Sequence, residues 1–125
     1  MKQTTTPTEI ETDPLDFDYL ERNYIKLGCK DVLYDVVEIF LETSAQKIEQ
    51  IKVSLETSTF DDLIKLAHGL KGESGSVGAK TVTALAAAQE QAARRGDIEE
   101  FKQRLPQLEF ELARAVARLK QEFSK

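Results

Sequence analysis

The chain has 125 residues, a formal net charge of −5, and 41% hydrophobic and 31% charged residues. This length suits a single domain with one modest core, and the negative charge argues against nucleic-acid phosphates as a partner. The sequence shows no apolar run long enough to span a bilayer and no secretory signal segment, so we expect a cytoplasmic protein that does not bind membranes.

The single cysteine, Cys29, cannot form an internal disulfide, which suits a reducing compartment. One histidine and one cysteine are also too few for a zinc site of ordinary ligation. Residues 1–14 are rich in threonine and acidic residues, and we expect a flexible tail there. A single helical domain is expected over residues 15–125.

The first helix is expected to begin at Asp16 and to end at Gly28. Its acidic residues lie in the first turns, where negative charge complements the helix dipole. Its apolar residues recur with helical spacing; they are Phe17, Leu20, Tyr24 and Leu27.

The second helix is expected over residues 31–55. Its inward stripe consists of Leu33, Val36, Val37, Phe40, Ser44, Ile48, Ile51 and Leu55. Thr59 and Asp62 then resemble a capping box that starts a third helix. The stripe of this third helix is Leu63, Leu66, Ala67 and Leu70, and Gly78 ends or interrupts it.

The fourth helix is expected over residues 80–95, with one face so rich in alanine that a neighbouring helix can approach closely. That face consists of Val82, Leu85, Ala86, Gln89, Ala92 and Ala93. Gly96 takes the usual stop position after a helix. Asp97 then caps the fifth helix, and Glu100 completes a capping-box spacing.

The fifth helix, over residues 98–123, has the most regular apolar period in the chain. Its inward residues are Ile98, Phe101, Leu105, Leu108, Leu112, Ala115, Leu119 and Phe123. Pro106 predicts a kink or a break near residues 103–105, because proline removes a backbone donor and clashes with the preceding turn.

Short connections between long helices place consecutive helices antiparallel. No strand-like alternation is present. The sequence therefore predicts an all-α fold, an antiparallel up-down four-helix bundle with an additional N-terminal helix.

Residues 67–78 contain the only histidine and four of the six glycines. On a helical projection His68 points roughly 140° away from Leu63, and so away from the core stripe. Ile64 and Gly72 lie one turn on either side of it, and Lys71 lies beside it. An exposed imidazole next to an ammonium group indicates an accessible nucleophile.

The glycines inside this helix need an explanation, because each costs roughly 1 kcal/mol relative to alanine. Gly69, Gly72 and Gly75 fall within two turns. Absent side chains allow another molecule to approach the backbone, so the pattern favours a surface at which a partner docks. The alternative is that this stretch is the frayed end of a helix.

The segment His68-Gly69-Leu70-Lys71-Gly72, followed by Gly78-Ala79, resembles the signature of histidine-containing phosphotransfer (HPt) domains. These domains carry phosphoryl groups between receiver domains in multistep phosphorelays. The resemblance covers about residues 15–123. One departure is Gly69, where the family often carries serine or threonine.

The resemblance implies a role for each matched residue. His68 would accept the phosphoryl group through its outer ring nitrogen, and Lys71 would stabilise the added negative charge. The docking surface around His68 would consist of Ile64, Lys65, Gly72 and Gly75.

The resemblance also implies a phosphocarrier without a catalytic centre of its own. The sequence has no glycine-rich nucleotide loop and no carboxylate cluster typical of a magnesium site, so we expect no cofactor in this chain and Mg²⁺ on the partner receiver domain. The expected partners are receiver domains of response regulators or a hybrid histidine kinase in a two-component regulatory system. We expect the chain to act as a monomer.

Two alternatives stay open. The same chemistry could operate within a larger hybrid or chemotaxis-type kinase. A different class is a non-phosphorylated helical adaptor that binds and blocks a receiver domain. Phosphorylation of His68 would separate a carrier from an adaptor.

Overall fold

The computed structural model describes residues 13–57 and 59–123, and within these ranges all regular structure is helical. A short helix, α2 (Phe17–Leu20), continues into a π-helical segment, η1 (Glu21–Ile25). The long helices are α3 (Lys30–Thr57), α4 (Phe60–Ser76), α5 (Lys80–Arg94) and α6 (Ile98–Phe123).

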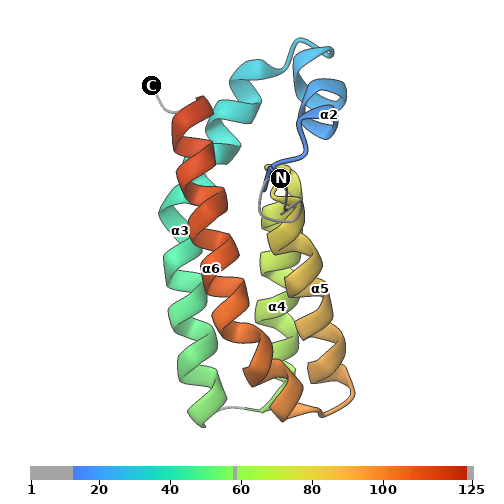
Figure 1. The fold of residues 1–125 in the computed structure, drawn as a ribbon, viewed down its shortest axis with the longest axis vertical. Helices are drawn as coiled ribbons and strands as arrows, with labels where there is room; N and C mark the ends of the chain where they lie inside the picture. The colour runs from blue at the N-terminus through green and yellow to red at the C-terminus, as the bar shows by residue number, and fades with distance from the viewer. Residues whose placement is uncertain (1–12, 58, 124–125) are drawn as a thin grey trace, which may run out of the picture.

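The four long helices alternate in direction, and α2 with η1 lies across one end of them (Figure 1). Helix α3 packs against α4 and α6, and α5 packs against the same two helices. This arrangement confirms the predicted all-α, antiparallel up-down four-helix bundle with an additional N-terminal helix. Each helix within the described ranges is too short or too polar to span a bilayer.

The predicted tail covers residues 1–14, of which residues 1–12 lie outside the described residues. Pro14 is buried, and the carboxylate of Asp13 forms an ion pair with Arg118 on α6 at 3.1 Å. Contact with the bundle therefore begins two residues before the predicted domain start.

The predicted apolar stripes form the core. Its fully buried large side chains include Leu33, Ile51, Leu63, Leu70, Phe101, Leu108 and Leu119. Gln89 is the polar member of the predicted α5 face, and it is fully buried. Its side-chain amide donates a hydrogen bond to the carbonyl of Phe101 at 3.2 Å, so α5 is tied to α6 through a buried polar contact.

The N-terminal helix differs from the prediction of one regular helix. The amide of Lys26 donates to the carbonyl of Glu21 at 2.8 Å, a π-type bond over five residues. This wider turn shifts the helical register, and Leu27, predicted to face inward, is 67% exposed. The hydroxyl of Tyr24 donates to the carbonyl of Ser76 at 2.8 Å, which ties the segment to the end of α4.

The predicted capping box at Thr59 is wrong, and of the kink or break predicted near residues 103–105 the break is absent. The side chain of Thr59 makes no capping hydrogen bond, although Asp97 accepts one from the amide of Glu100 at 3.1 Å. Helix α6 is not broken at Pro106. Pro106 and Lys102 are both exposed, so water can satisfy the Lys102 carbonyl that loses its usual donor.

The turn between α4 and α5 depends on Gly78, as the sequence predicts. Gly78 has a φ of +69°, and a Cβ there would lie 3.1 Å from the Cγ of Leu20. The Gly78 carbonyl accepts a hydrogen bond from the amide of Asp16 at 2.7 Å. The absent side chain thus lets the N-terminal segment pack on the turn that ends the histidine-bearing helix.

We predict opposite effects for alanine at two glycines. Gly78→Ala should lower the free energy of unfolding by about 1–3 kcal/mol, because it forces a side chain into a left-handed conformation against Leu20. Gly72→Ala should raise it by about 0.5–1 kcal/mol, because Gly72 is helical and a Cβ there has no atom within 4 Å. Urea unfolding of both variants measures the effects. A Gly78→Ala variant as stable as the wild type would contradict the account of this turn.

Candidate functional site

His68 lies on α4 with its side chain 64% exposed. Leu63 and Ala67 on the same helix are buried in the core. The imidazole therefore projects outward, as the helical projection of the sequence predicts.

A carboxylate from the neighbouring helix holds this imidazole. The Oε2 atom of Glu90 on α5 lies 3.2 Å from the Nδ1 atom of His68. The Glu90 side chain is only 3% exposed, and it also forms ion pairs with Lys71 at 2.9 Å and with Arg94 at 2.6 Å. One buried carboxylate thus joins three basic side chains from two helices.

Small residues bring α4 and α5 close enough for this contact. Ala86 and Ala93, one turn on either side of Glu90, are buried. Nearer the turn, the hydroxyls of Ser74 on α4 and Thr83 on α5 share a hydrogen bond of 2.8 Å. The sequence predicts from the alanine-rich face of α5 that a neighbouring helix approaches closely. The same face carries Glu90, so the close approach of α4 brings the Glu90 carboxylate to His68.

Glu90 is strongly held in its ionised form. Hydrogen bonds from Arg94, and then from Lys71, lower the pKa of Glu90 to about 2 against the opposing effect of burial. An ionised carboxylate only accepts hydrogen bonds, so the Nδ1 atom of His68 is the donor in this contact. In the neutral ring the proton then resides on Nδ1, and the lone pair of Nε2 is free.

Lys71 is not the isolated ammonium that the sequence suggests, because it is engaged with Glu90. Its side chain remains 35% exposed, and that of Arg94 is 51% exposed. The two cations outnumber the single carboxylate. The cluster of Glu90, Lys71 and Arg94 beside His68 therefore carries more positive than negative charge, which favours an added anion.

The four predicted docking residues differ in their surroundings. Lys65 is exposed, whereas Ile64 is half-buried against the core. A Cβ on Gly72 would meet no atom within 4 Å, and one on Gly75 would make an ordinary contact with Thr83 at 3.9 Å. Packing within the described residues does not require glycine at position 72. The fold therefore does not explain why the helix carries a residue that lowers its stability relative to alanine.

Sequence reasoning missed Glu90 and Arg94 as site residues. A usable signal was present, because Glu90 follows Ala86 by four residues on the buried face and precedes Arg94 by four. A carboxylate on a buried face requires a cationic partner. The spacing alone did not reveal that His68 and Lys71 contact the two oxygen atoms of one carboxylate, that of Glu90.

The model of the Hpt domain family matches residues 35–122, which is more than half of the chain. The chain belongs to the Hpt domain family. Hpt domains act in histidine phosphotransfer within phosphorelays, and they are phosphocarriers that interact with receiver domains. No similar curated protein and no similar solved structure was found.

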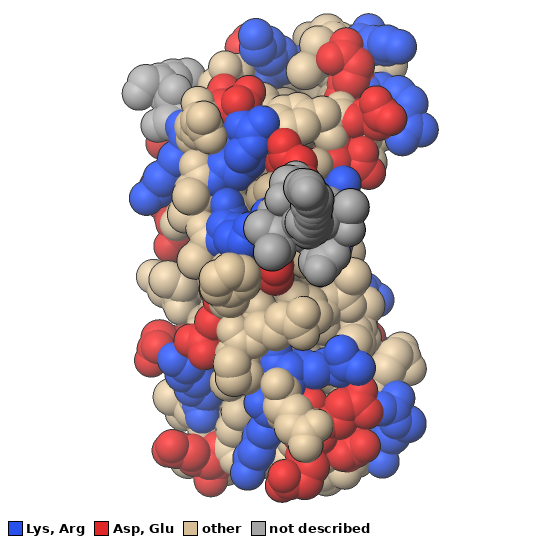
Figure 2. Space-filling view, viewed as in Figure 1, with Lys and Arg blue, Asp and Glu red and all other residues tan. Residues whose placement is uncertain are grey.

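The charges on the Hpt domain are dispersed on the face drawn in Figure 2, where basic and acidic side chains alternate. No continuous basic stripe of the kind that binds a nucleic-acid backbone runs over that face. Among the residues that the structure describes, no group of three or more His, Cys, Asp or Glu side chains is placed to hold a metal ion.

We predict that Glu90 determines the tautomer of His68. In Glu90→Ala the ring loses the acceptor for its Nδ1 proton, so the Nε2-protonated form should gain population. Long-range ¹H–¹⁵N correlation spectra of the imidazole, recorded well above the ordinary histidine pKa of about 6.5, measure this change. Glu100→Ala is the matched control, because Glu100 also pairs with two arginines, Arg95 and Arg104. An unchanged tautomer in Glu90→Ala would contradict the assignment.

Proposed function

We propose that His68 is the phosphoryl acceptor of this Hpt domain and that it exchanges the group with an aspartate of a receiver domain. The observation that carries the proposal is the contact between Nδ1 and the ionised Glu90 carboxylate. This contact keeps the proton on the inner nitrogen and leaves the lone pair of the exposed outer nitrogen for attack.

The transfer balances without any group changing its oxidation state. The Nε2 lone pair attacks the phosphorus of the aspartyl phosphate and forms a P–N bond. The bond from phosphorus to the acyl oxygen breaks, and the aspartate leaves as a carboxylate. The ring keeps its Nδ1 proton and gains positive charge, which the Glu90 carboxylate stabilises at 3.2 Å.

The cations that hold Glu90 have a second role in this proposal. Lys71 and Arg94 offset the charge of the carboxylate, so Glu90 does not repel the incoming phosphoryl group. Their exposed portions add positive potential where negative charge arrives. The receiver domain supplies Mg²⁺ and the aspartate, since phosphoryl transfer needs a metal to neutralise the developing charge.

A partner that surrounds His68 completes the reacting geometry. The open space over Gly72 lets a loop of the receiver come close to the α4 backbone, one turn from the imidazole. Lys65 and the exposed part of Ile64 flank the same surface. The chain acts as a monomer that offers one half of the site, and the partners are receiver domains of response regulators or of a hybrid kinase.

We predict that His68→Gln abolishes phosphoryl acceptance. Incubation with ³²P-labelled receiver domains should give an acid-labile phosphorylated wild-type protein and no label on the variant. The thermal midpoint should stay nearly unchanged, because the glutamine amide can still donate to Glu90 and the ion pairs of Glu90 with Lys71 and Arg94 remain. Acid-labile label on the variant would refute the assignment. Receiver binding by the wild type without any labelling would instead identify a blocking adaptor.

We predict that Lys71 shifts the phosphoryl equilibrium. Lys71→Ala should move it towards the receiver by about fivefold, the equivalent of ~1 kcal/mol for a partly exposed charge pair. The shift should shrink at high salt, because solvent-accessible charges are screened. Lys102→Ala, which removes an exposed lysine from α6, is the control. Equal equilibria for Lys71→Ala and wild type at low salt would reduce Lys71 to a structural partner of Glu90.

A further inference from the structure

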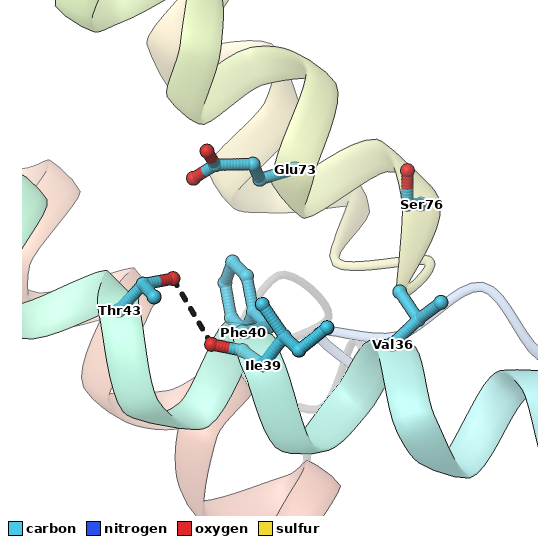
Figure 3. Close-up of a pocket in the computed structure, with 6 residues that line it drawn as sticks. All are labelled: Val36, Ile39, Phe40, Thr43, Glu73 and Ser76. Atoms are coloured by element: carbon cyan, nitrogen blue, oxygen red, sulfur yellow. Dashed lines mark hydrogen bonds between the residues drawn. The ribbon is translucent and has the colours of Figure 1, made fainter.

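An ion pair joins α3 to α4 close to His68. The Nζ atom of Lys47 on α3 lies 3.3 Å from the Oε2 atom of Glu73 on α4, and the Lys47 side chain is only 20% exposed. Figure 3 shows the Glu73 side chain extending from α4 above the ring of Phe40 on α3. Among the residues that the structure describes, Glu73 is the one ion-pair partner of Lys47. An ammonium group has three donors, so Lys47 keeps donors for another anion.

The absent side chain of Gly69 leaves room for this ammonium group. A Cβ at Gly69 would lie 3.4 Å from the Nζ atom of Lys47, and a larger side chain would put further atoms into the same space. Gly69 follows His68 directly. Because consecutive Cα atoms are about 3.8 Å apart, the Nζ atom of Lys47 lies within about 9 Å of the His68 Cα.

Lys47 approaches His68 from the side opposite to Lys71. On a helical projection Gly69 lies roughly 100° to one side of His68, and Lys71 lies roughly 60° to the other. The ammonium group of Lys47 lies beside Gly69, whereas its partner carboxylate comes from Glu73, which is about 7.5 Å past His68 along the helix axis. Cations from α3 and α4 therefore flank the imidazole on two sides.

We propose that Lys47 is a third cation of the phosphoryl site, beside Lys71 and Arg94, and that it stabilises the phosphorylated form of His68 from α3. The inference rests on the proposed function. A phosphoryl group carries a charge of about −1.5 to −2 near neutral pH, which is more than the single charge of Glu73. The flexible four-carbon stem of lysine lets the ammonium group turn towards the phosphoryl oxygens, and Glu73 holds it in the unphosphorylated protein.

The test measures the equilibrium constant for phosphoryl exchange between the full chain and the purified receiver domain that labels His68 most rapidly. This constant compares the separated proteins, so a change in docking alone leaves it unaltered. Lys47→Ala should shift it towards the receiver by about two- to threefold, and Gly69→Val should do the same because it displaces the ammonium group. Lys52→Ala should leave it unchanged. Lys52 is the matched control, because it also lies on α3 but pairs at 2.8 Å with Glu109 on α6.

Glu73→Gln separates this role from a purely structural one. The substitution frees the ammonium group of Lys47, so it should shift the equilibrium towards phosphorylated His68 by about twofold, opposite to Lys47→Ala. In the Lys47→Ala background its effect should be smaller, because no ammonium group is left to release. If the pair only ties α3 to α4, both single variants lower the free energy of unfolding in urea and leave the equilibrium constant at its wild-type value.

The outcomes for Lys47 and for the proposed function are distinguishable. A Lys47→Ala variant that leaves the equilibrium constant unchanged or shifts it towards His68 would overturn the inference, with His68 still labelled and the proposed function intact. A Glu73→Gln variant that does not shift the constant towards His68 would overturn it as well. Failure of every receiver to label His68 would overturn the proposed function and this inference with it.

Discussion

The site depends on one interaction, the contact of the Glu90 carboxylate with three basic side chains. Without Glu90 the imidazole of His68 would be an exposed ring, free to rotate and free to carry its proton on either nitrogen. With Glu90 ionised, the ring has a fixed donor atom at Nδ1 and a fixed lone pair at Nε2. Lys71 and Arg94 make this possible, because an unpaired carboxylate at 3% exposure would be expensive to keep charged.

That carboxylate reaches His68 because the helices that carry the two residues approach closely. Alanines occupy the α5 positions one turn on either side of Glu90, and the hydroxyls of Ser74 and Thr83 meet across the same interface. Larger side chains there would separate the helices and lengthen the 3.2 Å contact. The N-terminal segment contributes at a distance, since Tyr24 bonds to the last turn of α4 and Gly78 admits Leu20. The core packing and the chemistry of the site are therefore set by the same small residues.

Much of this fold could be predicted from the sequence, because helical periodicity and helix-stop glycines are local signals. Most residues of the predicted stripes of α3, α4, α5 and α6 are buried and the others pack against the core while partly exposed, and Gly78 and Gly96 both adopt positive φ. The π-helical turn in η1 could not be predicted, because nothing in the local sequence distinguishes it from a regular helix. Its consequence is the exposure of Leu27, which follows from the shifted helical register. Pro106 does not end α6, because Pro106 and Lys102 are exposed and solvent can reach the carbonyl that loses its donor.

The candidate site shows the same division between local and tertiary information. The outward direction of His68 follows from its position relative to Leu63, and this needs only one helix. The partner of its inner nitrogen requires the register of α5 against α4, which no single-helix pattern contains. The residue that holds the imidazole acts across a helix interface. Its role therefore becomes visible only when the packing of the bundle is known.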